Sequence, residues 1–280
     1  MTSSLVAGLG LALASAWAIN WGYFAQHAVA ARLPRLTPKR PVASLRLLFG
    51  ARRWLVGFLA GIGGWGLYVG ALALAPLSLV QAVSAGGIGV LALLVSREAG
   101  LAPRERRGVV VSILGLALLG GSLSGQGHGS HGSPWAVGAW VAVSLAAAGV
   151  AAVGRSAAGL ALGAGVLYAA GDVATKAAVP GGARFAFVPV LLACHGLAFV
   201  ALQLGFQRGG ALATAGVATL FTNALPIVAG TTLYDEGLGS VPVLRVLAFA
   251  LTIGGATLLA RPAAGGEAPG FRPGETPGTI

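Results

Sequence analysis

Two ionisable side chains, Asp172 and Lys176, lie four residues apart inside a long apolar stretch of this 280-residue chain. On a helix this spacing places both on one face, and the acid precedes the base, which is the favourable order for an ion pair. Charged groups at membrane depth are costly and usually face a cavity or a partner. The pair therefore indicates either contact with a solute, with or without proton coupling, or a structural ion pair whose lysine reaches the interface.

Further polar and aromatic side chains fall within other apolar stretches: Trp17, Asn20, Gln81, Ser84, Tyr168, His195, Thr222 and Asn223. Amide groups donate and accept hydrogen bonds, which suits a polar solute, but they also join neighbouring helices. His195 has the same two interpretations, as a helix contact or as a proton carrier. Together with Asp172 and Lys176, these residues are the expected substrate-binding site. We expect no catalytic residue, no metal site and no cofactor.

The elements that must position these side chains are membrane-spanning helices. Only 9% of the residues are charged, 56% are hydrophobic and the mean hydropathy is +0.84, whereas soluble proteins carry about 25% charged residues. This composition excludes an ordinary soluble enzyme and a disordered chain. Because Cys194 is the single cysteine, a disulfide framework is excluded as well. The net charge of +11 in so apolar a chain indicates membrane orientation rather than nucleic-acid binding.

A helix needs about 20 apolar residues to cross a bilayer, and nine stretches approach or exceed this length. They are Ser4–Ala31, Trp54–Ala75, Leu77–Ser96, Gly108–Leu123, Trp135–Val153, Ala157–Val179, Phe185–Phe206, Gly210–Tyr234 and Val241–Ala260. Only Pro76 separates the second stretch from the third, and together they would be far longer than one crossing. Pro76 therefore predicts a tight hairpin.

Lysine and arginine residues gather on one side of the predicted spans. Seven of them follow the first span and four follow the third, and Arg155, Arg208, Arg261 and Arg272 add to the same side, whereas the opposite loops offer only Arg184. By the positive-inside rule the basic side is cytoplasmic. We expect a multi-pass protein of the inner (plasma) membrane with its N-terminus outside and its C-terminus in the cytoplasm, as an odd number of crossings requires.

Two parts of the chain resemble one another. The span that ends at Arg97-Glu98 matches the span that ends at Asp235-Glu236, 138 residues later, and a glycine-bearing span follows each. A weaker match relates Trp17-x-x-Asn20 to Tyr168-x-x-Gly171-Asp172. Spans one to four thus resemble spans six to nine, and the fifth crossing inverts the second set. Many secondary transporters are built from such inverted repeats, with their substrate site near the midplane. Chance similarity in an Ala-, Gly- and Leu-rich chain is the alternative.

The expected fold is therefore all-α, a polytopic bundle of about nine transmembrane helices arranged as inverted repeats of four with a linking helix. Its expected parts are a first repeat over 1–123, an external loop and linking helix over 124–156, a second repeat over 157–260 and a disordered cytoplasmic tail over 261–280. Gly57-x-x-x-Gly61 and Gly159-x-x-x-Gly163 predict places where helix backbones approach closely.

The segment Ala71-Leu-Ala-Leu-Ala-Pro76-Leu-Ser-Leu-Val80, followed by Glu98 and then a glycine-rich helix, resembles the drug/metabolite transporter superfamily. Nine spans, rather than the ten of its EamA-like members, and the Ala-x-Ala-Pro-x-x-Leu-Val pattern are most similar to its NIPA-type branch, known as magnesium transporters. The resemblance covers most of residues 1–260. It implies a carrier for a small solute or an ion.

Three classes of function remain after these observations. We expect a carrier that moves a compact polar or zwitterionic solute by alternating access. A NIPA-like magnesium transporter fits less well, because the only carboxylate within a span, Asp172, is expected to pair with Lys176. A non-transporting membrane scaffold is the third class, and no catalytic motif favours an enzyme. The expected partners are a small-molecule or ion substrate and the lipid bilayer, with a homodimer as an open alternative and no nucleic acid.

Overall fold

The computed structural model describes residues 3–36, 39–121, 130, 132–236 and 242–260, and within them the chain is helical without strands. The helices are α1 (Ser3–Ala30), α2 (Pro41–Phe49), α3 (Arg52–Leu74), α4 (Leu77–Ser84), α5 (Gly87–Ala99), α6 (Pro103–Gly121), α7 (Pro134–Ala152), α8 (Ala157–Ala178), η1 (Gly182–Ala186), α9 (Phe187–Phe206), η2 (Leu212–Gly216), α10 (Val217–Leu233) and α11 (Pro242–Ala260). The expected tail, 261–280, and most of the expected external loop, 122–129 and 131, lie outside the described residues.

Seven helical segments in the described part of the chain are long and apolar enough to cross a membrane, and they make it a polytopic membrane protein. They are Ser3–Ala30, Arg52–Leu74, Leu77–Glu98, Pro134–Ala152, Ala157–Ala178, Gly182–Phe206 and Leu212–Leu233. Helices α6 and α11 occupy the other two predicted stretches. Four charged residues open α6, and the described apolar part of α11 is only Val246–Ala260, so these two are shorter apolar segments.

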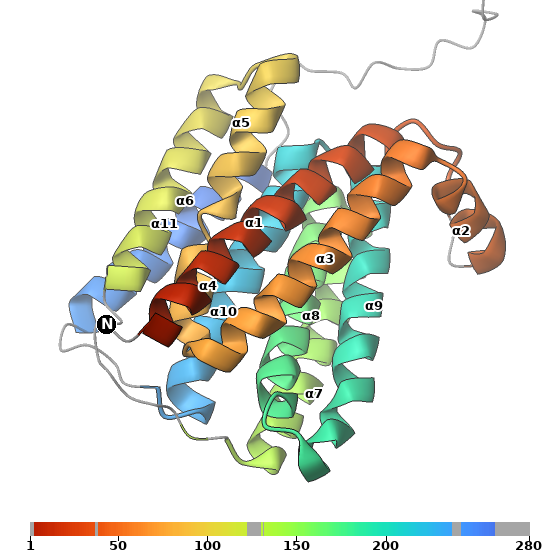
Figure 1. The fold of residues 1–280 in the computed structure, drawn as a ribbon. Coiled ribbons are helices and arrows are strands. Elements are labelled where there is room, and N and C mark those ends of the chain that lie inside the picture. Colours follow the sequence, from red (N-terminus) through yellow and green to blue (C-terminus); the bar gives the residue numbers. More distant parts are fainter. Residues whose placement is uncertain (1–2, 37–38, 122–129, 131, 237–241, 261–280) are drawn as a thin grey trace, which may run out of the picture.

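Three pairs of helices run side by side: α1 with α3, α8 with α9, and α6 with α11 (Figure 1). Helices α4 and α10 pack together, and α7 lies against α8. Glycines permit this closeness, since a Cβ on Gly57 would overlap the backbone of Gly22 on α1, and one on Gly159 would overlap the Ala151 carbonyl on α7. Both predicted glycine motifs therefore lie at helix interfaces.

The third predicted span is divided rather than continuous. Helix α4 ends at Ser84 and α5 begins at Gly87, with Ala85 and Gly86 between them. The amide of Asn20 on α1 packs so closely on Gly87 that a Cβ there would overlap it. Paired glycines weaken a helix, and this contact with α1 fixes the site of the break. In the second half, a π-helical turn, η2, precedes α10.

The hairpin predicted at Pro76 is held by a charge on each side. Lys176 on α8 lies beside the C-terminal end of α3, where its Nζ donates to the carbonyls of Leu72 (3.2 Å) and Ala75 (3.3 Å). The carbonyl end of a helix carries partial negative charge, which favours a cation there. Lys176 therefore fixes the end of α3 against α8.

A carboxylate holds the other side of the same turn. Glu236, which follows α10, is 3% exposed and accepts the backbone N–H groups of Leu77 (2.7 Å) and Ser78 (2.8 Å) at the start of α4. The amide end of a helix favours negative charge. The carboxylate fits because Gly230 has no side chain, and a Cβ there would overlap it. We call the contacts of Lys176 and Glu236 with this turn the Pro76 clamp.

The short helix α2 was not expected from the sequence. It lies in the basic segment between α1 and α3, apart from the main bundle (Figure 1). Leu48 is buried, and the ring of Phe49 packs on Trp54 and Phe58 with centroids 5.1 and 5.5 Å away. An apolar face joined to basic residues is typical of a helix that lies along a membrane surface.

Candidate functional site

A cavity of about 520 Å³ lies among α1, α3, α4, α8, α9 and α10, with α2 at its rim. Eight of the ten predicted binding residues line it: Asn20, Gln81, Ser84, Tyr168, Asp172, His195, Thr222 and Asn223. These residues come from both halves of the chain. The folding of the bundle thus brings most of the predicted site together.

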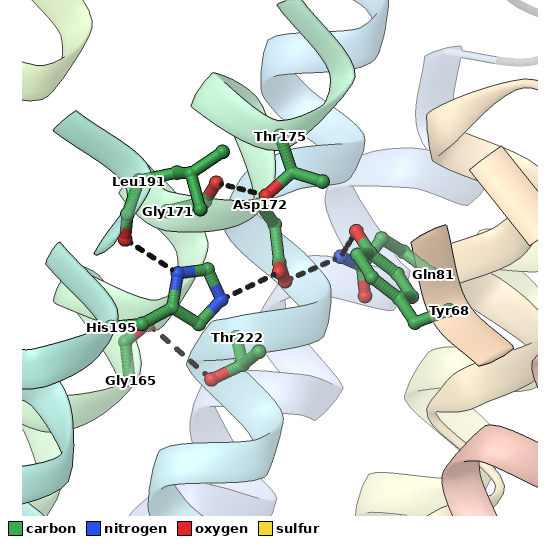
Figure 2. A network of polar contacts seen from close by, with 9 residues as sticks. All are labelled: Tyr68, Gln81, Gly165, Gly171, Asp172, Thr175, Leu191, His195 and Thr222. Atoms are coloured by element: carbon green, nitrogen blue, oxygen red, sulfur yellow. Dashed lines mark hydrogen bonds and ion pairs between the residues drawn. The ribbon is translucent and has the colours of Figure 1, made fainter. Parts of the chain in front are cut away.

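The buried carboxylate of Asp172 joins four helices at this cavity (Figure 2). Its Oδ2 accepts a hydrogen bond of 2.9 Å from Gln81 Nε2 on α4, and its Oδ1 lies 3.5 Å from His195 Nε2 on α9. The same Gln81 nitrogen donates to the Tyr68 hydroxyl on α3 at 2.7 Å. An amide nitrogen has two protons to donate, so Gln81 fixes Asp172 and Tyr68 together.

Contacts on several sides hold the ring of His195, which also lines the cavity. Its Nδ1 lies 2.8 Å from the Leu191 carbonyl one turn earlier on α9. Trp65 and Tyr168 lie edge-on to the ring, each with a centroid distance of 5.7 Å. A Cβ on Gly171 would overlap the imidazole, so the glycine beside Asp172 makes room for this histidine. The contacts leave Nε2 directed at the carboxylate.

The predicted ion pair between Asp172 and Lys176 is wrong. The ammonium of Lys176 donates to the carbonyls of Leu72 and Ala75 in the Pro76 clamp, and the residue does not line the cavity. The four-residue spacing does place both side chains on the face of α8 that lies toward α3 and α4. Asp172 accepts a hydrogen bond from Gln81 there, whereas Lys176 extends to the C-terminal end of α3. Acid and base therefore do not share the site.

Trp17 also lies outside the cavity. Its side chain is 57% exposed and stacks on Trp21 with ring centroids 6.5 Å apart. Its predicted counterpart, Tyr168, does line the cavity. The difference follows from the surroundings, because α8 is covered by α7, α9 and α10, whereas several residues of α1, Trp17 included, are exposed within the described part of the chain.

Several buried polar atoms of the cavity have no hydrogen-bond partner in the described part of the chain: Ser15 Oγ, Asn20 Oδ1, Trp65 Nε1, Ser84 Oγ and Thr219 Oγ1. The amide nitrogens of Asn20 and Asn223 instead donate to the carbonyl four residues earlier, at 2.9 and 2.6 Å. Buried polar groups are normally paired, and each exception calls for an explanation. Each of these atoms is covered by its neighbours in this conformation, so a molecule in the cavity would reach them only after the lining rearranges.

Sequence reasoning missed the aromatic part of the lining. We call it the aromatic wall, formed by Tyr23, Phe58, Trp65, Tyr68, Tyr168 and Phe199, of which only Tyr168 was predicted. Phe58, Trp65 and Tyr68 are spaced by seven and three residues, which places them along one face of α3. This spacing could have indicated that the three rings face the same cavity, but aromatic residues that face lipid follow the same spacing.

A second buried network ties the opposite end of the bundle. Gln203 on α9 donates to Gln26 Oε1 on α1 at 2.6 Å and accepts from Trp54 Nε1 on α3 at 3.1 Å. All three residues are buried. Both ends of the cavity are thus bounded by polar contacts between helices, with the Asp172 site nearer the Pro76 clamp.

The arrangement can bind a molecule through one carboxylate, one imidazole, several amides and hydroxyls, and aromatic faces. Among the described residues no three His, Cys, Asp or Glu side chains converge as metal ligands would. Comparison of the chain with protein-family models, curated proteins and solved structures finds no match. Function must therefore be argued from the cavity itself.

Proposed function

We propose that this protein is a membrane carrier of the drug/metabolite type that moves a small solute by alternating access. The observation that carries the proposal is the cavity, where polar residues from both halves surround polar atoms that lack partners. Leaving a buried polar group unsatisfied costs about 1–3 kcal/mol. We infer that the lining rearranges around a bound solute and that these groups then gain partners, which a scaffold would not provide.

An inverted repeat of α1–α6 and α8–α11, linked by α7, is part of this proposal. It is supported by matching contacts, since α1 packs on α3 and on the α4–α5 pair much as α8 packs on α9 and α10. The fourth members, α6 and α11, pack on each other. Each third member contains an irregularity, the α4–α5 break or the π turn η2. A substrate site at the meeting of two repeats is typical of secondary transporters.

We place nine crossings in the membrane, with the Pro76 clamp at the outer end. Arg184 lies at that end, where it donates to the Gly132 carbonyl. The Arg53–Glu98 ion pair and the basic α1–α3 segment lie at the other end, which we take as cytoplasmic. The distribution of basic residues supports this orientation. The N-terminus is then outside and the C-terminus inside.

A magnesium carrier is the alternative that the resemblance implies. The objection that Asp172 is already paired with Lys176 no longer holds, because Lys176 donates to the carbonyls of Leu72 and Ala75 instead. Magnesium keeps several water ligands and needs polar walls around them. A lining with a single carboxylate and an aromatic wall fits an organic solute better.

The test is solute-dependent stabilisation of the purified protein, followed by flux. A ligand of the folded state raises its melting temperature, so neutral, zwitterionic, anionic and cationic metabolites and Mg²⁺ are screened in detergent. We expect at least one class to stabilise the protein and to be transported into proteoliposomes, and Asp172→Asn to abolish both effects. Asp235→Asn is the matched control, since Asp235 is exposed and outside the cavity. Failure of every class to bind, with flux equal to empty liposomes, overturns the carrier.

A further inference from the structure

The segment that joins α1 to α3 is a basic stretch at one surface of the membrane. Both helices are long and apolar enough to cross the bilayer, and they run side by side, so the chain leaves and re-enters the membrane at the same surface. The segment and the first turn of α3 carry seven basic residues: Arg32, Arg35, Lys39, Arg40, Arg46, Arg52 and Arg53. No aspartate or glutamate precedes Glu98 in the sequence. The neighbouring sequence therefore leaves this charge uncompensated.

The fold compensates little of this charge either. Arg53 pairs with Glu98 at 3.3 Å, and its guanidinium lies 5.9 Å from the centroid of the Phe24 ring. Five other arginines are exposed and have no ion pair within the described part of the chain: Arg32, Arg35, Arg40, Arg46 and Arg52. Charges of one sign gathered on a surface attract partners of the opposite sign. The segment thus presents a positive surface that an anionic partner would complement.

Helix α2 adds apolar side chains to this positive surface. Val42, Leu45 and Phe49 are 69%, 45% and 44% exposed, and their spacing of three and four residues places them along one face of the helix. Leu48 is buried and holds α2 to the bundle. Arg46 borders the exposed face, where an arginine stem can lie along apolar surface while its guanidinium reaches a polar layer. Helices with these two properties lie at the boundary between headgroups and acyl chains.

An anionic phospholipid complements both the charge and the apolar face. Its acyl chains would cover the exposed side chains of α2, and its phosphate would meet the arginines. A zwitterionic lipid would leave the positive charge uncompensated, and a soluble anion would leave the apolar face in water. A second copy of this chain would bring the same seven positive charges to the contact, and like charges repel. Charge complementarity therefore selects the anionic lipid among these occupants.

Helix α2 also forms part of the rim of the cavity. Leu45 and Phe49 belong to the cavity lining. The ring of Phe49 packs on Trp54 and Phe58 of α3, and Phe58 in turn meets Phe199 of α9 with ring centroids 5.5 Å apart. Helix α2 therefore lies beside the contact between α3 and α9, where the cavity reaches the surface of the bundle. A lipid that holds α2 in place also holds this part of the rim.

We propose that α2 and the basic residues around it bind the headgroups of anionic phospholipids, with the exposed face of α2 among the adjoining acyl chains. In the proposed orientation these lipids belong to the inner leaflet. Each lysine or arginine close to an anionic membrane surface contributes about a fivefold preference for that surface over a neutral one. Binding of lipid here does not depend on which solute the cavity carries.

The experiment measures which lipid lies against α2. A fluorophore is attached to a single cysteine, Val42→Cys in a Cys194→Ser background, and the full-length protein is reconstituted into phosphatidylcholine vesicles. An equal small fraction of the lipid is nitroxide-labelled phosphatidylglycerol or nitroxide-labelled phosphatidylcholine. We expect labelled phosphatidylglycerol to quench the fluorophore several times more strongly, and salt to reduce the difference, because salt screens exposed charges. Unlabelled phosphatidylglycerol should compete, whereas inorganic phosphate should not.

Two double variants locate the surface on the protein. Arg40→Gln/Arg46→Gln should lower the preference for phosphatidylglycerol by at least about fivefold. Arg106→Gln/Arg107→Gln removes two exposed charges from the start of α6, on the opposite side of the bundle from α2 (Figure 1), and should preserve the preference. The comparison of the two lipids needs neither variant, so it stands if one fails to fold. Equal quenching by the two lipids, or competition by inorganic phosphate as strong as by phosphatidylglycerol, overturns the lipid surface. Equal losses in the two variants overturn its place on α2.

Discussion

Removing the carboxylate of Glu236 should cost far more stability than removing that of Glu98, its match in the sequence 138 residues earlier. Glu236 is 3% exposed and accepts two backbone hydrogen bonds of 2.7 and 2.8 Å from the start of α4. Hydrogen bonds to a charged group contribute about 1.5–3 kcal/mol each. Glu236→Ala should therefore lower the free energy of unfolding by roughly 3–6 kcal/mol, and Glu236→Gln, which keeps one acceptor oxygen, by about half as much.

Glu98 supplies the matched control. It lies 138 residues before Glu236 and pairs with Arg53 at 3.3 Å, but both side chains are more than half exposed. Exposed pairs contribute about 0–1 kcal/mol, so Glu98→Ala should change little. Equilibrium unfolding in mixed detergent micelles, followed by tryptophan fluorescence, measures both. Equal losses for Glu98→Ala and Glu236→Ala would refute the Pro76 clamp as a buried, charge-assisted contact.

Other predictions follow from single contacts. Lys176→Met should lower the melting temperature while leaving the affinity for a solute found in the thermal-shift screen within about twofold by calorimetry, because its ammonium bonds to α3 carbonyls; a large loss of affinity would return it to the site. Gly87→Ala should weaken solute binding, since the new Cβ displaces the Asn20 amide; Gly10→Ala, with open space around it, is the control in the same calorimetric titration. Gln203→Ala leaves Gln26 and Trp54 without their buried partner and should cost about 2–4 kcal/mol in micelle unfolding; a loss below about 1 kcal/mol would count against that network.

The positions of the long apolar helices, though not of α2, could be predicted because a bilayer crossing imposes a length and an apolar composition that are local properties of the sequence. The hairpin at Pro76 was predictable for the same reason, since a run of that length needs a break. The break between α4 and α5 was not, because it depends on Asn20 from another helix. A glycine pair alone does not predict a break, since Gly63-Gly64 lies within α3 without interrupting it.

Most of the candidate site could be predicted because polar residues are rare enough in apolar helices to stand out individually. The hydrogen-bond partners of these residues were harder to predict, since pairing depends on which helix ends meet. Lys176 bonds to carbonyls that every helix possesses, so no residue type marks its partner. The aromatic wall was missed because Trp65 and Tyr68 resemble the lipid-facing aromatics of any membrane helix, such as Trp17.

As a carrier, the protein must open its cavity in turn to each side of the membrane. The most direct measurement places one cysteine there, Ser84→Cys, in a Cys194→Ser background, since Cys194 is the only native thiol. A membrane-impermeant thiol reagent is applied to proteoliposomes from the outside, or trapped within them. The carrier predicts labelling from both sides and protection by a solute that stabilises the protein in the thermal-shift screen. Labelling from neither side, or from one side only at every solute concentration, would contradict it.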